Sequence, residues 1–193
     1  MHIGLAPKQA GFEIFENNFG NVLLSPEARG ERINIEGRVF DGAGSLVHDV
    51  LVEIWQANAY GKYAHPSDRQ DKPDDPAFRG WGRACASFET GVFSFDTVKP
   101  GRVAGPGGAP QAPHVCLVLF ARGINAGLHT RLYFDDELEA NRSAPEQTSV
   151  EWEVRRQTLI AQRSERDGAL VYALDIYLQN TPDGGRETVF FDI

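Results

Sequence analysis

Side chains that could bind a metal or an anion gather in four separated stretches of the chain. These are 52–63 (VEIWQANAYGKY), 75–83 (DPAFRGWGR), 97–101 (TVKPG) and 112–116 (APHVC). Tyr63, His114 and Cys116 are residue types that can bind a metal, and cysteine and histidine suit zinc. Each also has a structural explanation: a packed loop aromatic, a core histidine satisfied by a hydrogen bond, and a small buried thiol. We favour the structural explanation for all three residues.

The elements that must position these stretches are mainly strands. Seven runs are predicted as strands: 33–40, 50–56, 92–98, 115–120, 131–134, 170–179 and 187–193. The run 115–120 is apolar on both faces, which predicts a central strand covered on both sides. Segments 61–80 and 101–113 hold few periodic apolar residues. They are predicted to be long loops, which tend to carry function in a compact β domain.

Helix signals are weaker than strand signals. An acidic run at 135–141 could form a short helix, and Thr148 with Glu151 resembles a capping box before a helix at 152–157. At least seven strands with little helix predict an all-β fold, namely a β-sandwich. No change in composition marks a boundary, so we expect a single domain over residues 1–193.

Composition excludes several classes of protein. The formal net charge of −8 argues against nucleic acid as a partner, since the chain would repel phosphates. No apolar run approaches the roughly 18 residues that a membrane span requires, and the start of the chain has no signal-peptide pattern. Cys85 and Cys116 are the only cysteines, which is not a disulfide framework. We therefore expect a cytoplasmic protein.

The four stretches, in this order and at this spacing, resemble the motifs of the intradiol catechol dioxygenases. The pattern runs from about Ile33 to Phe134. The resemblance implies a β-sandwich with long loops and one or two short helices. It also implies a non-haem Fe(III) held by two tyrosines and two histidines. Fe(III) favours anionic oxygen donors, and two histidines at i and i+2 of one strand face the same side.

The resemblance places the four ligand positions at Tyr63, Val103, His114 and Cys116. Tyr63 and His114 keep the family's first tyrosine and first histidine. At the second tyrosine position Val103 has no donor atom, and at the second histidine position Cys116 replaces the imidazole. The inherited site would lack its second anionic oxygen. We therefore expect no functional Fe(III) in this chain and treat the four positions as degenerate.

Further stretches resemble the iron-free, alpha-type chain of two-chain family members that cleave protocatechuate. They are 2–5 (HIGL), 112–114, 119–125 (LFARGIN), 128–137 (LHTRLYFDDE) and 187–192 (ETVFFD). The resemblance implies a beta-type partner chain that holds the Fe(III), with protocatechuate and O2 bound at the interface. Alpha-type chains also carry an arm before the HIGL stretch, and His2 follows Met1 directly here, so we expect the arm to be missing.

Arg122 is the substrate-binding candidate that this resemblance implies. A guanidinium complements a carboxylate by charge and by its fork geometry, which would suit the carboxylate of protocatechuate. The alternative is a solvated surface arginine on a turn. His129, Arg131 and Tyr133 are weaker candidates for facing the partner.

Two other functions stay open at this point. The chain could be a self-sufficient catechol-type dioxygenase that uses Tyr63, His114 and an unidentified ligand. It could also be a β-sandwich binding module without enzymatic activity, which the acidic composition permits. Stoichiometric iron in the chain alone would indicate the first, and a stable monomer with a polar surface all round would indicate the second.

Overall fold

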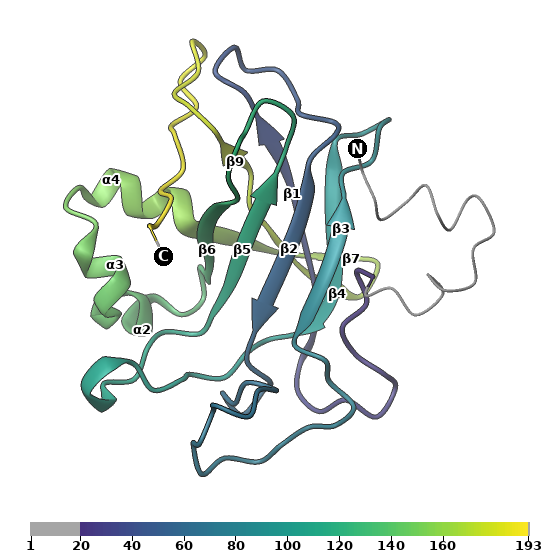
Figure 1. Ribbon diagram of the computed structural model, residues 1–193, viewed down its shortest axis with the longest axis vertical. Helices are drawn as coiled ribbons and strands as arrows, with labels where there is room; N and C mark the ends of the chain where they lie inside the picture. Colours follow the sequence, from purple (N-terminus) through teal and green to yellow (C-terminus); the bar gives the residue numbers. More distant parts are fainter. Residues whose placement is uncertain (1–19, 193) are drawn as a thin grey trace.

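The computed structural model describes residues 20–192. The HIGL stretch at 2–5 and the question of the arm lie outside the described residues. Within them, nine strands form one sheet, and strands adjacent in space are often far apart in sequence (Figure 1). In spatial order they are β3 (Trp81–Cys85), β2 (Leu51–Gln56), β5 (His114–Phe120), β6 (Leu128–Phe134), β7 (Ile160–Arg166), β8 (Ala169–Ala173), β1 (Arg32–Phe40) and β4 (Val92–Val98). Strand β9 (Ile176–Tyr177) pairs with β1 beyond β8.

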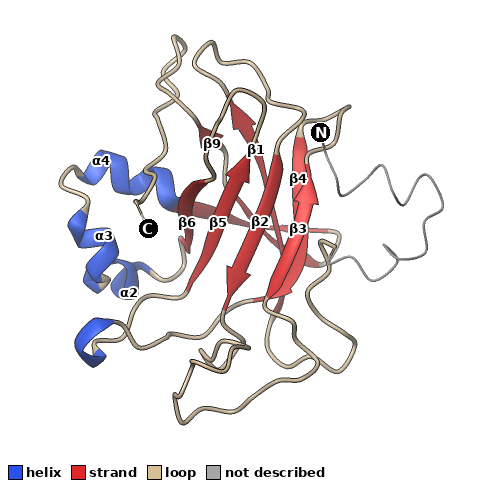
Figure 2. Cartoon of the chain, viewed as in Figure 1, coloured by secondary structure: helices blue, strands red, loops and turns tan. Residues whose placement is uncertain are grey.

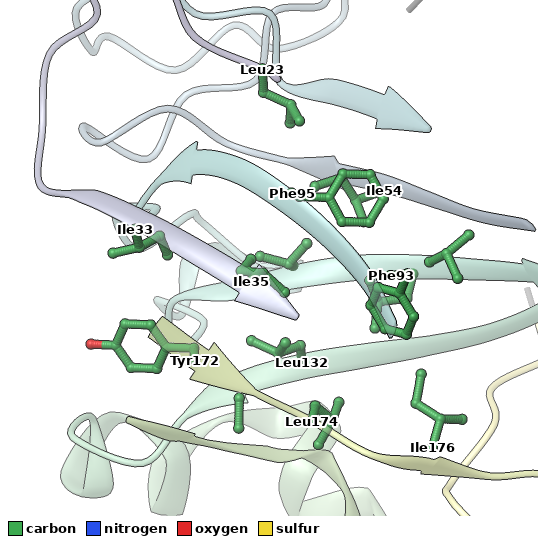
Figure 3. Close-up of a cluster of buried hydrophobic side chains, with 14 of the residues drawn as sticks. Leu23, Ile33, Ile35, Ile54, Phe93, Phe95, Leu132, Tyr172, Leu174 and Ile176 are labelled. Carbon is green, nitrogen blue, oxygen red and sulfur yellow. The ribbon is translucent and has the colours of Figure 1, made fainter. Parts of the chain in front are cut away.

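The sheet nearly closes on itself around a shared core. Its two end strands, β3 and β4, contact one another. Strand alternation sends one side of each strand inward, so that Ile35 of β1, Phe95 of β4 and Leu132 of β6 are all fully buried. Figure 3 shows these side chains, with Phe93, gathered in one interior. The all-β fold with packed sheets that the sequence predicts is thus confirmed.

Short helices lie beside β6 and cover that side of the sheet (Figure 2). They are α2 (Leu138–Ser143), α3 (Pro145–Ser149) and α4 (Glu153–Arg156), with 3-10 turns η2 (Pro106–Gly108) and η3 (Gln157–Leu159). The described residues thus contain a few short helices, three where the resemblance implied one or two. The predicted capping box is wrong, because Thr148 lies inside α3 and donates its hydroxyl to the carbonyl of Pro145 (2.9 Å).

Several predicted strands differ from the structure. The run 170–179 is split into β8 and β9, and 187–192 forms no strand. Its backbone instead makes separate hydrogen bonds, from Thr188 to the carbonyl of Tyr177 and from Phe191 to that of His129. Strands β3 and β7 were not predicted. No helix within the described part of the chain has the length and apolar character that crossing a membrane would take.

Candidate functional site

Three of the four positions that the resemblance gives as ligand positions, Tyr63, His114 and Cys116, lie at one end of the β2–β5–β6 part of the sheet, on its outer face. Strand β5 begins there with His114, which is paired with Tyr133 of β6, and Cys116 is paired with Arg131. The intervening residues, such as Val115, point into the core and are buried. The outer face of β5 is only partly covered, since Cys116 is half-buried, so the prediction of a strand covered on both sides is wrong there.

Tyr63 reaches this face from the first long loop, which is folded by its own polar groups. The Oδ1 atom of Asn58 accepts hydrogen bonds from the backbone N–H groups of Tyr60 (2.9 Å) and Lys62 (3.0 Å). Gly61 between them has φ +79°, a conformation that favours glycine. The Tyr63 ring then stacks on Trp55 of β2, with centroids 5.8 Å apart and planes 2° from parallel. The predicted long loop is confirmed, and its conformation delivers Tyr63 to the site.

His114 is a neutral, buried imidazole. Its Nδ1–H donates to the carbonyl of Ala112 at 2.8 Å, which leaves Nε2 as an acceptor facing the Tyr63 hydroxyl at 3.4 Å. Burial, aided by the nearby Arg131 cation, lowers the pKa of His114 to about 4. Burial also raises the pKa of the Tyr63 phenol, so both side chains are uncharged at neutral pH.

The other two positions offer no anionic donor. Val103 is buried and apolar, at 4% exposure. Burial raises the pKa of the Cys116 thiol, so it stays protonated at neutral pH. Both cysteines are free thiols.

A cation from the protein itself lies among these groups. Nη1 of Arg131 donates to Oε1 of Gln111 (2.9 Å), lies 3.5 Å from the Tyr133 hydroxyl and forms an ion pair with Oε1 of Glu146 (3.4 Å). Only 22% of the Arg131 side chain is exposed. Tyr133 is fully buried, so the suggestion that it faces a partner is wrong. Sequence reasoning missed the Arg131 cluster, because neither the strand register nor the position of α3 can be read from the residues.

Arg122 lies far from this cluster. It follows β5 in the turn that joins β5 to β6, at the opposite end of the strands from the loop after β2 (Figure 1). Along a strand of this length the two ends are about 20 Å apart. The Arg122 side chain is 88% exposed and pairs with Asp49 at 3.3 Å. Beside it lies a hollow of about 410 Å³ that Phe88 also lines.

Known proteins show the same sequence pattern and fold. The family model described as "Dioxygenase" matches residues 20–180. The protocatechuate 3,4-dioxygenase alpha chain of Pseudomonas putida is 46% identical over 192 residues, covering 100% of this chain and 91% of that one. The chain belongs to the intradiol dioxygenase family. A second family member, the protocatechuate 3,4-dioxygenase beta chain of Burkholderia cepacia, is 39% identical over 167 residues, covering 82% of this chain and 69% of that one.

The fold of the family is shared by more distant members. The crystal structure of 3-chlorocatechol 1,2-dioxygenase from Rhodococcus opacus 1CP superposes with a TM-score of 0.62 at 19% identity, covering 81% of this chain and 63% of that one. The intradiol dioxygenase family is iron-dependent, which makes the four degenerate positions the place to test for iron.

These four positions do not fit Fe(III). Only the Tyr63 phenol could supply an anionic oxygen, and Val103 supplies nothing. The residues described contain no cluster of three or more His, Cys, Asp or Glu side chains that could hold a metal ion. The guanidinium of Arg131 instead stands beside the remaining donors.

Proposed function

We propose that this chain is the iron-free, alpha-type subunit of a protocatechuate 3,4-dioxygenase. Identity of 46% with an alpha chain over the full length of the sequence carries this proposal. The degenerate donor set supports it, since Tyr63, Val103, His114 and Cys116 do not suit Fe(III). The iron would be held by a beta-type partner chain, related to the beta chain that this sequence also resembles.

The assembled enzyme would open the ring of protocatechuate between its two hydroxylated carbons. Both atoms of O2 enter the product, 3-carboxy-cis,cis-muconate, so no external reductant is needed. The ring chemistry belongs to the partner's iron. This chain would wall the pocket, exclude water and hold the substrate in place, which matters kinetically even far from the bond that breaks.

Arg122 is the residue of this chain that we assign to the substrate carboxylate. Its position supports this role, because its guanidinium is almost fully exposed at the tip of a turn and its ion pair with Asp49 is exchangeable. Two large apolar side chains near it, Phe88 at 67% and Phe120 at 40% exposure, also remain uncovered in this chain. Exposed apolar groups around a charged side chain are typical of a surface that a partner covers.

Expression of the full chain with and without a beta-type partner tests the proposal. We expect dioxygenase activity and a defined hetero-oligomer only when both chains are present, and no activity from this chain alone. Ring cleavage by the isolated chain would instead support a self-sufficient dioxygenase. A stable monomer that never binds the partner would support a binding module.

A further inference from the structure

A positive charge lies beside Tyr63, His114 and Cys116, and the missing ligands do not explain it. We propose that Arg131 is the resident cation of this cluster and actively excludes metal ions from it. On this view, restoring the lost donors would not restore iron binding while Arg131 remains. The inference rests on the proposed iron-free role of the chain and explains how that role is enforced.

The contacts of Arg131 fix its guanidinium within the group of donors. Its Nη1 is held by Gln111 from the second long loop and by Glu146 from α3, at 2.9 and 3.4 Å. On the sheet, Arg131 pairs across strands with Cys116, and Tyr133 lies two residues further along the same face of β6. Contacts from a loop, a helix and two strands leave the side chain little freedom to move away.

The positive charge acts on the donor side chains themselves. Arg131 is an electrostatic neighbour of Tyr63, His114 and Cys116, the three remaining donors at the degenerate positions. The geometry agrees, because Cys116 lies opposite Arg131 across the two strands, and His114 lies opposite Tyr133, whose hydroxyl is 3.5 Å from Nη1 of Arg131. A metal bound by these donors would therefore have the guanidinium as a neighbour.

A guanidinium in this position opposes metal binding in two ways. It cannot lose its proton at any ordinary pH, so its charge cannot be removed to admit an ion. Repulsion grows with the product of the charges and is weakly screened in a buried site, so a trivalent ion is opposed most strongly. Arg131 also pairs with the Glu146 carboxylate at 3.4 Å, so this anionic oxygen donor is already engaged by the guanidinium.

The test compares restored donors with and without the cation. The double variant V103Y/C116H replaces both lost ligands, and V103Y/C116H/R131Q also removes the charge while keeping a hydrogen-bond donor for Gln111. Each full chain is produced with its beta-type partner, and iron is counted per pair with the visible tyrosinate-to-iron absorption. We expect the double variant to match the natural chain, and the triple variant to gain a further iron with new absorption.

Two controls separate charge from packing. V103Y/C116H/R131K keeps a positive charge and should still exclude iron. Since Val103 is buried and a tyrosine there could prevent folding, C116H and C116H/R131Q are compared as well, by Co(II) titration followed by absorption. Removing Arg131 should tighten Co(II) binding by about tenfold or more.

Iron uptake by V103Y/C116H with Arg131 in place would overturn the inference and leave the proposed function intact. Equal Co(II) affinity for C116H and C116H/R131Q would overturn it too. Iron in the natural chain would instead refute the proposed function itself.

Discussion

Replacing Arg122 by alanine should weaken protocatechuate turnover without destabilising the chain. The ion pair of Arg122 with Asp49 is exposed, at 88% and 22% of the two side chains, and such pairs contribute about 0–1 kcal/mol. A charge-assisted hydrogen bond to the substrate carboxylate contributes roughly 1.5–3 kcal/mol. Its loss corresponds to a decrease of about 10- to 150-fold in kcat/KM for protocatechuate.

The assay uses the assembled enzyme with two substrates. Catechol lacks the carboxylate, so its kcat/KM should change less than about twofold in the Arg122→Ala enzyme. Arg142→Ala, at an exposed arginine on α2, is the matched control and should change neither substrate. A decrease of equal size for both substrates would refute the carboxylate role, because the residue would then act on the pocket or on assembly in general.

Three further perturbations test the structure of the chain. His114→Asn should flatten the dependence of the unfolding free energy on pH. The pKa of His114 is about 4 in the folded chain and 6.5 ordinarily, so the unfolded chain takes up a proton first as the pH falls. The natural chain should therefore lose about 3 kcal/mol of unfolding free energy between pH 6.5 and pH 4, and the variant should not. Lys99→Met should cost about 2–3 kcal/mol in urea unfolding, because Lys99 is 14% exposed and pairs with two carboxylates, at 2.8 and 3.0 Å. Gly61→Ala should cost more than about 2 kcal/mol, because the residue has positive φ and the added methyl would overlap a carbonyl of the second loop.

Each of these changes has a matched control. His65→Asn alters an exposed histidine and should leave the pH profile unchanged. Arg38→Met removes a more exposed ion pair, with Asp175, and should cost under about 1 kcal/mol. Gly168→Ala shares the positive φ but has open space around it, so it should cost only about 1 kcal/mol. Equal losses for variant and control would contradict the stated cause in each case.

The strands that alternate apolar and polar residues could be predicted from sequence. Strands β1 and β4 follow that pattern, and their inward residues, such as Ile35 and Phe95, are buried as expected. Strand β7 gives no such signal, since five of its seven residues are exposed. Strand β3 is short and contains small and polar residues, so its sequence lacks the alternation of apolar and polar residues that predicts a strand. Conversely, 187–192 contains the apolar run Val189 to Phe191 but makes only separate backbone hydrogen bonds and no regular strand pairing.

The candidate site could be predicted in part. Motif order identifies Tyr63, His114 and Cys116, and the structure brings them to one end of the sheet. The role of Arg131 could not be predicted, because it depends on which residue of β5 lies opposite it and on where α3 packs. Strand register and helix packing are set by tertiary structure. A shift of one residue in the pairing of β6 with β5 would have turned the Arg131 side chain toward the core.

The most direct test of the central claim is the iron content of the assembled enzyme. The purified complex of this chain with its beta-type partner should contain a single iron per pair. Mutation of the partner's own ligands should remove all of it. Iron that remains with this chain after that mutation, with tyrosinate-to-iron absorption, would contradict the account.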